Sequence, residues 1–167
     1  MEPSKVLKGK KILIVDDEAD VLEILTELLD ICRIDKASSF EEAKKLLESQ
    51  TYDIAILDIM GVKGFELLKI ANTQKIPALM LTAHGLSEES LKKSAEEGAL
   101  YYAPKEKMND IDLFVADVLD AIDNKKNPWA KWFERLAGFY DGRFHGPNWR
   151  EQEQEFWKEK LKKYPEL

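Results

Sequence analysis

The sequence predicts an α/β fold in which a five-stranded parallel sheet is covered by helices on both faces. Two observations support this fold: short apolar runs alternate with amphipathic segments along residues 1–124, and acidic side chains directly follow two of those runs. Continuous apolar runs suit strands that are buried on both faces, and a helix between successive strands gives parallel pairing. Residues 125–167 differ in composition and are expected to form a helical extension.

Five segments are expected to be strands. Apolar, partly β-branched runs lie at residues 12–15, 54–57 and 78–81, and a weaker run lies at 99–103. A short strand around Ile34 completes the set, because it separates two amphipathic segments that would otherwise follow each other.

The segments between these runs have the i, i+3, i+4, i+7 spacing of helices. Helices are predicted over residues 21–29, 40–47, 65–71, 88–97 and 111–122. Ser39 and Glu42 match a capping box at the start of the second helix, and Asn109 is the expected cap of the fifth.

The chain has room for one domain of ordinary size with an extension, because it has 167 residues. No apolar run approaches the ~18 residues that span a bilayer, and the basic, polar start lacks the apolar core of a secretory signal. A soluble, cytoplasmic protein is therefore expected, with no membrane partner. The single cysteine, Cys32, is expected to act as a small apolar residue near a helix end.

Charge divides the chain at about residues 123–128. Residues 1–124 carry 15 Lys and Arg against 25 Asp and Glu, whereas residues 125–167 carry 10 against 7. Residues 1–124 are acidic, and a net charge of +3 on residues 125–167 gives only weak attraction to the phosphates of nucleic acid. No direct nucleic-acid partner is therefore expected. The domains predicted are 1–124 and a Trp-rich extension, 125–167.

The extension contains all four tryptophans of the chain. Asn127 and Pro128 are suited to begin a helix, and a break is expected at 141–147 before a second helix. Two aromatic faces are predicted, consisting of Trp129, Trp132, Phe133, Leu136 and Tyr140, and of Trp149, Phe156, Trp157, Leu161 and Tyr164. Such faces must be buried, and a homodimer is slightly favoured over packing against the rest of the same chain.

Polar side chains follow the predicted strands at the point where each strand ends. Asp16 and Asp17 follow the first strand, Asp58 the third, Thr82 the fourth and Lys105 the fifth. The carboxyl ends of parallel strands share one edge of the sheet, where ligands bind. Three clustered carboxylates need a cation, and Mg²⁺ is the natural candidate because it binds a few carboxylates and keeps several waters. With the hydroxyl and the ammonium group, they form a site for a phosphoryl group.

Simpler interpretations remain open for each residue alone. The aspartates could cap the helices that follow them, Thr82 could be an ordinary strand-end hydroxyl, and Lys105 a solvated lysine. His84 is more often an exposed loop residue than a catalytic one, and nothing nearby supplies a triad or a zinc set.

From about residue 10 to 123 the chain resembles the receiver domains of response regulators. This resemblance implies the doubly wound strand order 2-1-3-4-5, which is that of a chemotaxis receiver. The resemblance implies that Asp58 accepts a phosphoryl group from a histidine kinase or phosphotransfer protein, its partner. Asp17 would bind Mg²⁺ directly, Asp16 mostly through water, and the Met60 carbonyl would be a further ligand. Thr82 would bind a phosphoryl oxygen and Lys105 would neutralise its charge.

The resemblance also implies roles for three further positions. Thr82 and Tyr102 would form a conformational switch, and bulk at Met60 and His84 would slow hydrolysis of the acyl phosphate. The loop "DIMGVKG" after Asp58 is two residues shorter than the usual family form and lacks its proline. Pro104 precedes Lys105 rather than following it, so the bond from Lys105 to Glu106 is expected to be trans.

Two functions are consistent with these residues. The first is a phosphorylated signalling receiver that is not an enzyme beyond slow dephosphorylation of itself. The second is a binding or dimerisation module that uses the same fold without phosphorylation. The presence of Asp16, Asp17, Asp58, Thr82 and Lys105 together favours the first.

Overall fold

The computed structural model describes residues 2–83, 87–144, 146 and 148–162, and it confirms the predicted sheet. Five parallel strands are arranged in the order β2-β1-β3-β4-β5. The strands are β1 (Lys11–Val15), β2 (Arg33–Ala37), β3 (Ile54–Asp58), β4 (Ala78–Thr82) and β5 (Tyr101–Pro104).

Helices alternate with the strands, as the sequence predicts. They are α2 (Ala19–Leu28), α3 (Phe40–Ser49), α4 (Gly64–Thr73), α5 (Glu88–Glu96) and α6 (Ile111–Asp123). Helix α2 packs beside α6, and α3 packs beside α4, because right-handed crossovers place the helices on two faces of the sheet. Every residue of β3 and β4 is buried, which explains why these strands are continuous apolar runs.

A short helix, α1 (Pro3–Leu7), precedes β1 and was not predicted. Five residues are too few to show a helical period, so the spacing of apolar residues does not indicate this helix. Helix α1 packs on α6, and Leu7 is buried in the core. Leu7 also brings its carbonyl within 3.4 Å of the Cys32 sulfur, which can donate to it. The described helices include none that is both long enough and apolar enough to cross a bilayer.

Cys32 is expected to be a poorly reactive thiol. The residue is half-buried and packs against the core, as the sequence predicts, and burial raises the pKa of its thiol to about 11. A pKa about two units above that of a free thiol lowers the reactive thiolate fraction about a hundredfold at neutral pH. Labelling with a disulfide reagent at pH 8 should therefore be much slower in the native protein than in denaturant. Equal rates would contradict this burial.

The two predicted helix caps have different outcomes. The Ser39 side chain accepts a hydrogen bond from the backbone N–H of Glu42, as in a capping box. The Glu42 carboxylate bonds back to Ser38 rather than to the Ser39 N–H, so the box is shifted by one residue on that side. The cap predicted at Asn109 is wrong. A 3-10 helix, η1 (Lys105–Asp110), leads directly into α6, whose N-cap is Asp110 without a side-chain cap bond.

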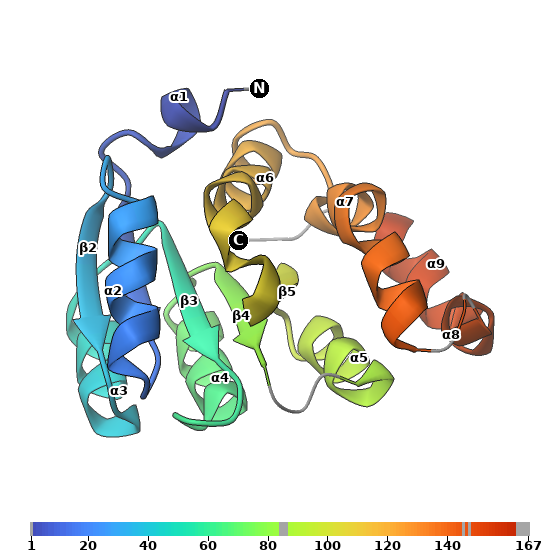
Figure 1. Ribbon diagram of the computed structural model, residues 1–167, viewed down its shortest axis with the longest axis horizontal. Coiled ribbons are helices and arrows are strands. Elements are labelled where there is room, and N and C mark those ends of the chain that lie inside the picture. Colours follow the sequence, from blue (N-terminus) through green and yellow to red (C-terminus); the bar gives the residue numbers. More distant parts are fainter. Residues whose placement is uncertain (1, 84–86, 145, 147, 163–167) are drawn as a thin grey trace.

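The tail forms α7 (Pro128–Arg143), α8 (Asn148–Gln152) and α9 (Gln154–Lys162). Asn127 caps α7 as predicted, since its side chain accepts from the N–H of Trp129. The expected break starts later than residue 141, because α7 continues to Arg143, and the second segment is divided into α8 and α9. Figure 1 shows α7, α8 and α9 together beyond the β5 edge of the sheet, at the far end of the molecule from β2.

All four tryptophans are buried within the single chain, which confirms that the aromatic faces are covered. Trp132 is fully buried and stacks on Trp157 at a ring distance of 6.0 Å. Packing against the same chain is therefore sufficient for this burial, and self-association stays a prediction. Leu161 was expected in the buried face but is 40% exposed. Tyr164 lies outside the described residues.

Candidate functional site

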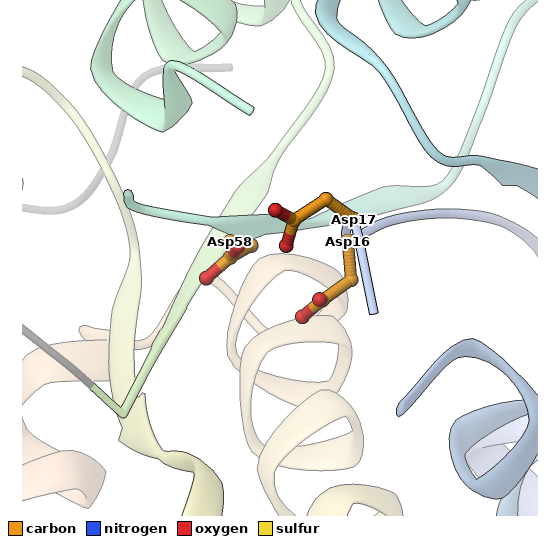
Figure 2. Close-up of side chains that lie close together, drawn as sticks. All are labelled: Asp16, Asp17 and Asp58. Carbon is orange, nitrogen blue, oxygen red and sulfur yellow. The ribbon is translucent and has the colours of Figure 1, made fainter. Parts of the chain in front are cut away.

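The carboxyl edge of the sheet brings the predicted site residues together. Asp16 and Asp17 directly follow β1, while Asp58 and Thr82 are the last residues of β3 and β4. Lys105 follows β5 and begins η1. Figure 2 shows the carboxylates of the three aspartates turned toward a common space. One oxygen from each lies within 4.8 Å of the others, as expected for side chains at neighbouring ends of parallel strands.

The Lys105 ammonium links the acidic side chains. Its Nζ lies 2.8 Å from Oδ2 of Asp16 and 3.4 Å from Oδ1 of Asp58. It also lies 3.3 Å from Oε2 of Glu18, a residue not predicted to belong to the site. The only sequence signal for Glu18 was its place directly after the two aspartates. The solvated-lysine interpretation of Lys105 is wrong, because the residue is 9% exposed and paired with this carboxylate group.

Asp16 is fully buried, and it orients the start of α2 as well as facing Lys105. Its Oδ1 accepts a hydrogen bond of 2.9 Å from the backbone N–H of Glu18, the N-cap residue of α2. Its Oδ2 contacts the Lys105 ammonium but receives no well-aligned hydrogen bond from the described residues. Asp17, in contrast, is exposed.

Burial and the neighbouring charges shift the pKa values of three groups at the site. Burial raises the pKa of Asp58, and the charge of Asp16 raises it further, while Lys105 opposes both effects. Burial likewise raises the pKa of Asp16 against the opposing bond from Lys105. Burial disfavours the charged form of Lys105, but the carboxylates of Asp16 and Asp58 outweigh it and raise the pKa of the ammonium group. The site is therefore rich in carboxylates that lack full compensation by protein cations.

The short loop after Asp58 approaches the site closely. The Gly61 N–H donates to Oδ2 of Asp58 at 3.1 Å, so the loop itself orients the carboxylate. A Cβ atom on Gly61 would lie 2.3 Å from Oδ1 of Asp17 and 2.6 Å from Oδ2 of Asp58. A Cβ atom on Gly64 would lie 2.3 Å from the backbone oxygen of Asp58. Both glycines are thus required by close approach, and neither was assigned a role from sequence. Met60 is 64% exposed.

Thr82 and Tyr102 lie on the neighbouring strands β4 and β5. Thr82 is 1% exposed and pairs in register with Pro104, one residue before Lys105. Tyr102 is fully buried, and its hydroxyl contacts the hydroxyl of Ser90 on α5. The expected switch residue therefore points inward here, and burial raises the pKa of its phenol. No cis peptide bond occurs among the described residues, so Lys105 to Glu106 is trans as expected. His84 lies outside the described residues.

The residues at this edge fit a hard divalent cation. A buried carboxylate oxygen of Asp16 lacks a well-aligned hydrogen bond from the described residues, and three carboxylates share one space. Gly61 also lets the loop come close to Asp17 and Asp58, because a Cβ atom there would collide with both carboxylates. Oxygen ligands in this arrangement are those that Mg²⁺ prefers. This fit supports the predicted ligand group of Asp16, Asp17 and Asp58.

The doubly wound sheet and the acidic group with a lysine at its carboxyl edge define a receiver domain of two-component signalling. Comparison with known families agrees. The model for the response regulator receiver domain matches residues 12–116, more than half of the chain. The chain belongs to this family, and α7, α8 and α9 lie beyond the matched residues.

Individual relatives show how far the similarity extends. The heme response regulator HssR of Staphylococcus aureus strain Newman is 45% identical over 76 residues, which are 42% of this chain and 34% of HssR. The match thus spans about a third of that relative. A CheY-like receiver domain protein of Methanospirillum hungatei is 26% identical with a TM-score of 0.64, covering 70% of this chain and 98% of the other. A receiver domain protein of Clostridium thermocellum is also 26% identical, with a TM-score of 0.60 over 68% of this chain and 97% of the other.

Proposed function

We propose that this receiver accepts a phosphoryl group on Asp58 and signals through the resulting change in conformation. The observation that supports this most directly is the position of the Asp58 carboxylate. It is 5% exposed, lies 3.4 Å from the Lys105 ammonium, and is accompanied by two further carboxylates. A nucleophilic oxygen beside a cation and a metal-binding group is the arrangement that phosphoryl transfer to a carboxylate requires.

In the proposed reaction a carboxylate oxygen of Asp58 attacks the phosphorus of a phosphohistidine. The new O–P bond forms as the N–P bond breaks, and the leaving imidazole takes up a proton. The Gly61 N–H holds one carboxylate oxygen at 3.1 Å, and Lys105 lies beside the other at 3.4 Å. Lys105 neutralises charge on the transferred group, and the Thr82 hydroxyl at the adjacent strand end binds one of its oxygens.

Mg²⁺ is part of this proposal. Asp17 and Asp58 would bind it directly, Asp16 mostly through water, and the Met60 carbonyl would complete the protein ligands. When bound, the ion supplies positive charge that stabilises the phosphoryl oxygens in transfer. The chain's own contribution is to hold the carboxylates together against their repulsion, which Lys105 offsets only in part.

In this function the domain does not act on external substrates. Apart from accepting the phosphoryl group, the domain would only hydrolyse its own acyl phosphate, at a slow rate that Met60 and His84 limit. The phosphoryl donor would be a sensor histidine kinase or a phosphotransfer protein, and the family resemblance implies a cytoplasmic location. The second candidate, a binding module independent of phosphorylation, is favoured by one observation: the tail carries a large aromatic surface that packs on the receiver, where Trp132 is fully buried and donates to the Tyr102 carbonyl.

Phosphoryl uptake is expected to require Asp58 and Mg²⁺. Incubation of the full chain with Mg²⁺ and a small phosphodonor should add one phosphoryl group to the intact mass, and chelation of the metal should prevent it. Asp58→Asn should abolish uptake, because the nucleophile is lost. Asp30→Asn is the matched control, since Asp30 is an exposed aspartate outside the carboxylate group of the site. Uptake that persists in Asp58→Asn would refute the assignment of the acceptor.

A further inference from the structure

A groove lies between α6, α7 and α9, at the seam between the receiver and its tail, and we call it the tail groove (Figure 1). Its volume of about 470 Å³ is within the range of binding pockets. The apolar part of its lining consists of Ala121 of α6, Ala130 of α7 and Leu161 of α9. Leu161 is 40% exposed, whereas Trp157, one turn earlier on α9, is 4% exposed. The groove therefore presents an apolar side chain that the described residues leave partly uncovered.

Three lysines border the tail groove: Lys126 in the link before α7, Lys131 on α7 and Lys162 at the end of α9. The ammonium of Lys131 lies 3.3 Å from the carboxylate of Glu134, which also lines the groove. Lys126 and Lys162 are exposed, and within the described part of the chain no carboxylate forms an ion pair with either of them. Two unpaired positive charges therefore lie beside an apolar surface.

The other acidic side chains of the lining reduce this positive charge without cancelling it. Asp117 is buried, and Arg135 binds both oxygens of its carboxylate, at 2.6 and 3.0 Å. Asp120 accepts a hydrogen bond of 2.9 Å from the side-chain amide of Asn124. Basic side chains therefore remain in excess at the groove. A partner that carries carboxylates beside apolar side chains would be complementary to it.

Helix α2 carries this combination on another surface of the same chain. Residues 16–31 contain seven acidic side chains and no lysine or arginine. The first three of these acids belong to the carboxylate site, but Glu23 and Glu27 lie farther along the helix. Glu27 is nine residues beyond Glu18 in the sequence. That separation is about 13 Å along a helix axis, so the carboxylate site does not account for the charge at this end of α2.

The acids of α2 repel one another and flank exposed apolar side chains. Glu23 and Glu27 are both exposed and four residues apart, a spacing at which like charges destabilise a helix. Ile24 is 36% exposed and Ile31, just beyond the end of α2, is 42% exposed. Among the described residues four large apolar side chains are exposed, of which these two lie on the α2 surface and Leu161 lies in the tail groove. Exposed apolar side chains thus occur on two surfaces of opposite charge.

The two surfaces lie on opposite sides of α6. Figure 1 shows α6 between α2, near the β2 end of the sheet, and the tail helices α7 and α9. Helix α2 of one chain can therefore reach only the groove of another chain. Each chain supplies one helix and one groove, so a two-fold axis allows two copies to form the same contact twice. Two such contacts together can reach the ~1,200 Å² that a specific interface requires.

We propose that two copies of this chain form a dimer in which α2 of each copy lies against the tail groove of the other. Glu23 and Glu27 of one copy face Lys126 and Lys162 of the second copy, and the exposed isoleucines pack near its Leu161. Neither surface includes Asp58. The inference is therefore independent of the proposed function, and its failure would leave phosphoryl transfer untouched.

The mass of the full chain in solution tests this dimer without any phosphodonor. Size-exclusion chromatography with light scattering should show the mass of two chains at high protein concentration and of one chain on dilution. The dimer should weaken at high salt, because salt screens exposed charges. The mass of a single chain at every concentration and salt would overturn the proposal.

Reversal of charge on each surface tests the pairing itself. One variant combines Lys126→Glu with Lys162→Glu, and the other combines Glu23→Lys with Glu27→Lys; all four side chains are exposed, so the fold is preserved. Each variant should weaken the dimer about 30-fold, since the two contacts together lose four exposed ion pairs. An equimolar mixture of the two variants should dimerise again, because each contact then joins opposite charges. A mixture that stays monomeric would overturn the pairing of α2 with the groove.

Lys44→Glu combined with Lys45→Glu is the matched control for net charge. Both lysines are exposed on α3, outside the two surfaces. This variant should dimerise as the wild-type chain does. A loss equal to that of the groove variant would overturn the proposal, because it would show an effect of net charge rather than of the groove.

Residues 163–167 are the alternative occupant of the groove. They follow Lys162 directly in the sequence and lie outside the described residues. A chain that ends at Lys162 should dimerise as the full chain does. Dimerisation of the shortened chain alone would overturn the proposal, because it would show that the chain's own end fills the groove.

Discussion

Deletion of residues 125–167 is expected to lower the free energy of unfolding by about 5 kcal/mol, the burial energy of two large aromatic side chains. Trp132 and Tyr140 are fully buried, and both contact Tyr102 of β5. Without them the outer face of β5 is open to water, and Asp117 loses its arginine partner. Because domains of this size have a total stability of about 5–15 kcal/mol, a chain that ends at Asn124 should be marginally stable.

Urea unfolding followed by circular dichroism measures this difference. A matched variant isolates the ion pair: Arg135→Met leaves Asp117 buried without its arginine and should cost about 3 kcal/mol. Addition of Asp117→Asn should recover part of that loss, because the amide oxygen can still accept from Tyr101. Equal unfolding midpoints for the full chain and the chain ending at Asn124 would show that the tail is not part of the folded core.

Gly61→Ala is expected to reduce phosphoryl uptake about 10- to 100-fold, the effect of displacing reacting groups by about 1 Å. The added Cβ would lie 2.3 Å from Oδ1 of Asp17 and 2.6 Å from Oδ2 of Asp58. Both carboxylates are terminal groups that can turn aside, so the fold is preserved while the site is spread apart. Uptake rates from intact mass, measured over a range of Mg²⁺ concentrations, should also show that the variant needs more Mg²⁺ for half-maximal uptake, because the carboxylates that would hold the metal are spread apart.

Gly138→Ala provides the control for this substitution. Gly138 lies within α7, and a Cβ there would meet nothing within 4 Å. Alanine is favoured over glycine inside a helix by about 1 kcal/mol, so this variant should be slightly more stable with normal uptake. Normal uptake in Gly61→Ala would mean that the loop after Asp58 does not approach the reacting carboxylate in solution.

The sheet and the site were predictable because each strand is indicated by its own apolar run, and parallel pairing then places the strand ends together. Residues such as Ile54 and Leu81 belong to runs that are apolar throughout, which is typical of strands buried on both faces. Once the strands are placed, parallel pairing alone brings Asp16, Asp58 and Lys105 to one edge.

Other features were not predictable, because they depend on contacts between distant residues. The bond from Trp132 to the Tyr102 carbonyl joins residues 30 positions apart, and the helical spacing of the tail does not show which surface will cover it. Glu18 joins the site only because the Lys105 side chain reaches it from the start of η1, just after β5. The cap at Asn109 was predicted wrongly because η1 continues the chain into α6, and a 3-10 turn has no distinct sequence period.

The position of the phosphoryl group on the chain can be determined by peptide mapping. The full chain is incubated with Mg²⁺ and a small phosphodonor, the acyl phosphate is reduced with borohydride, and peptides are mapped by mass spectrometry. We expect the modification at Asp58 alone, since this buried carboxylate contacts both Gly61 and Lys105. Modification at Asp16 or Asp17, or no modification under conditions that preserve the fold, would contradict it.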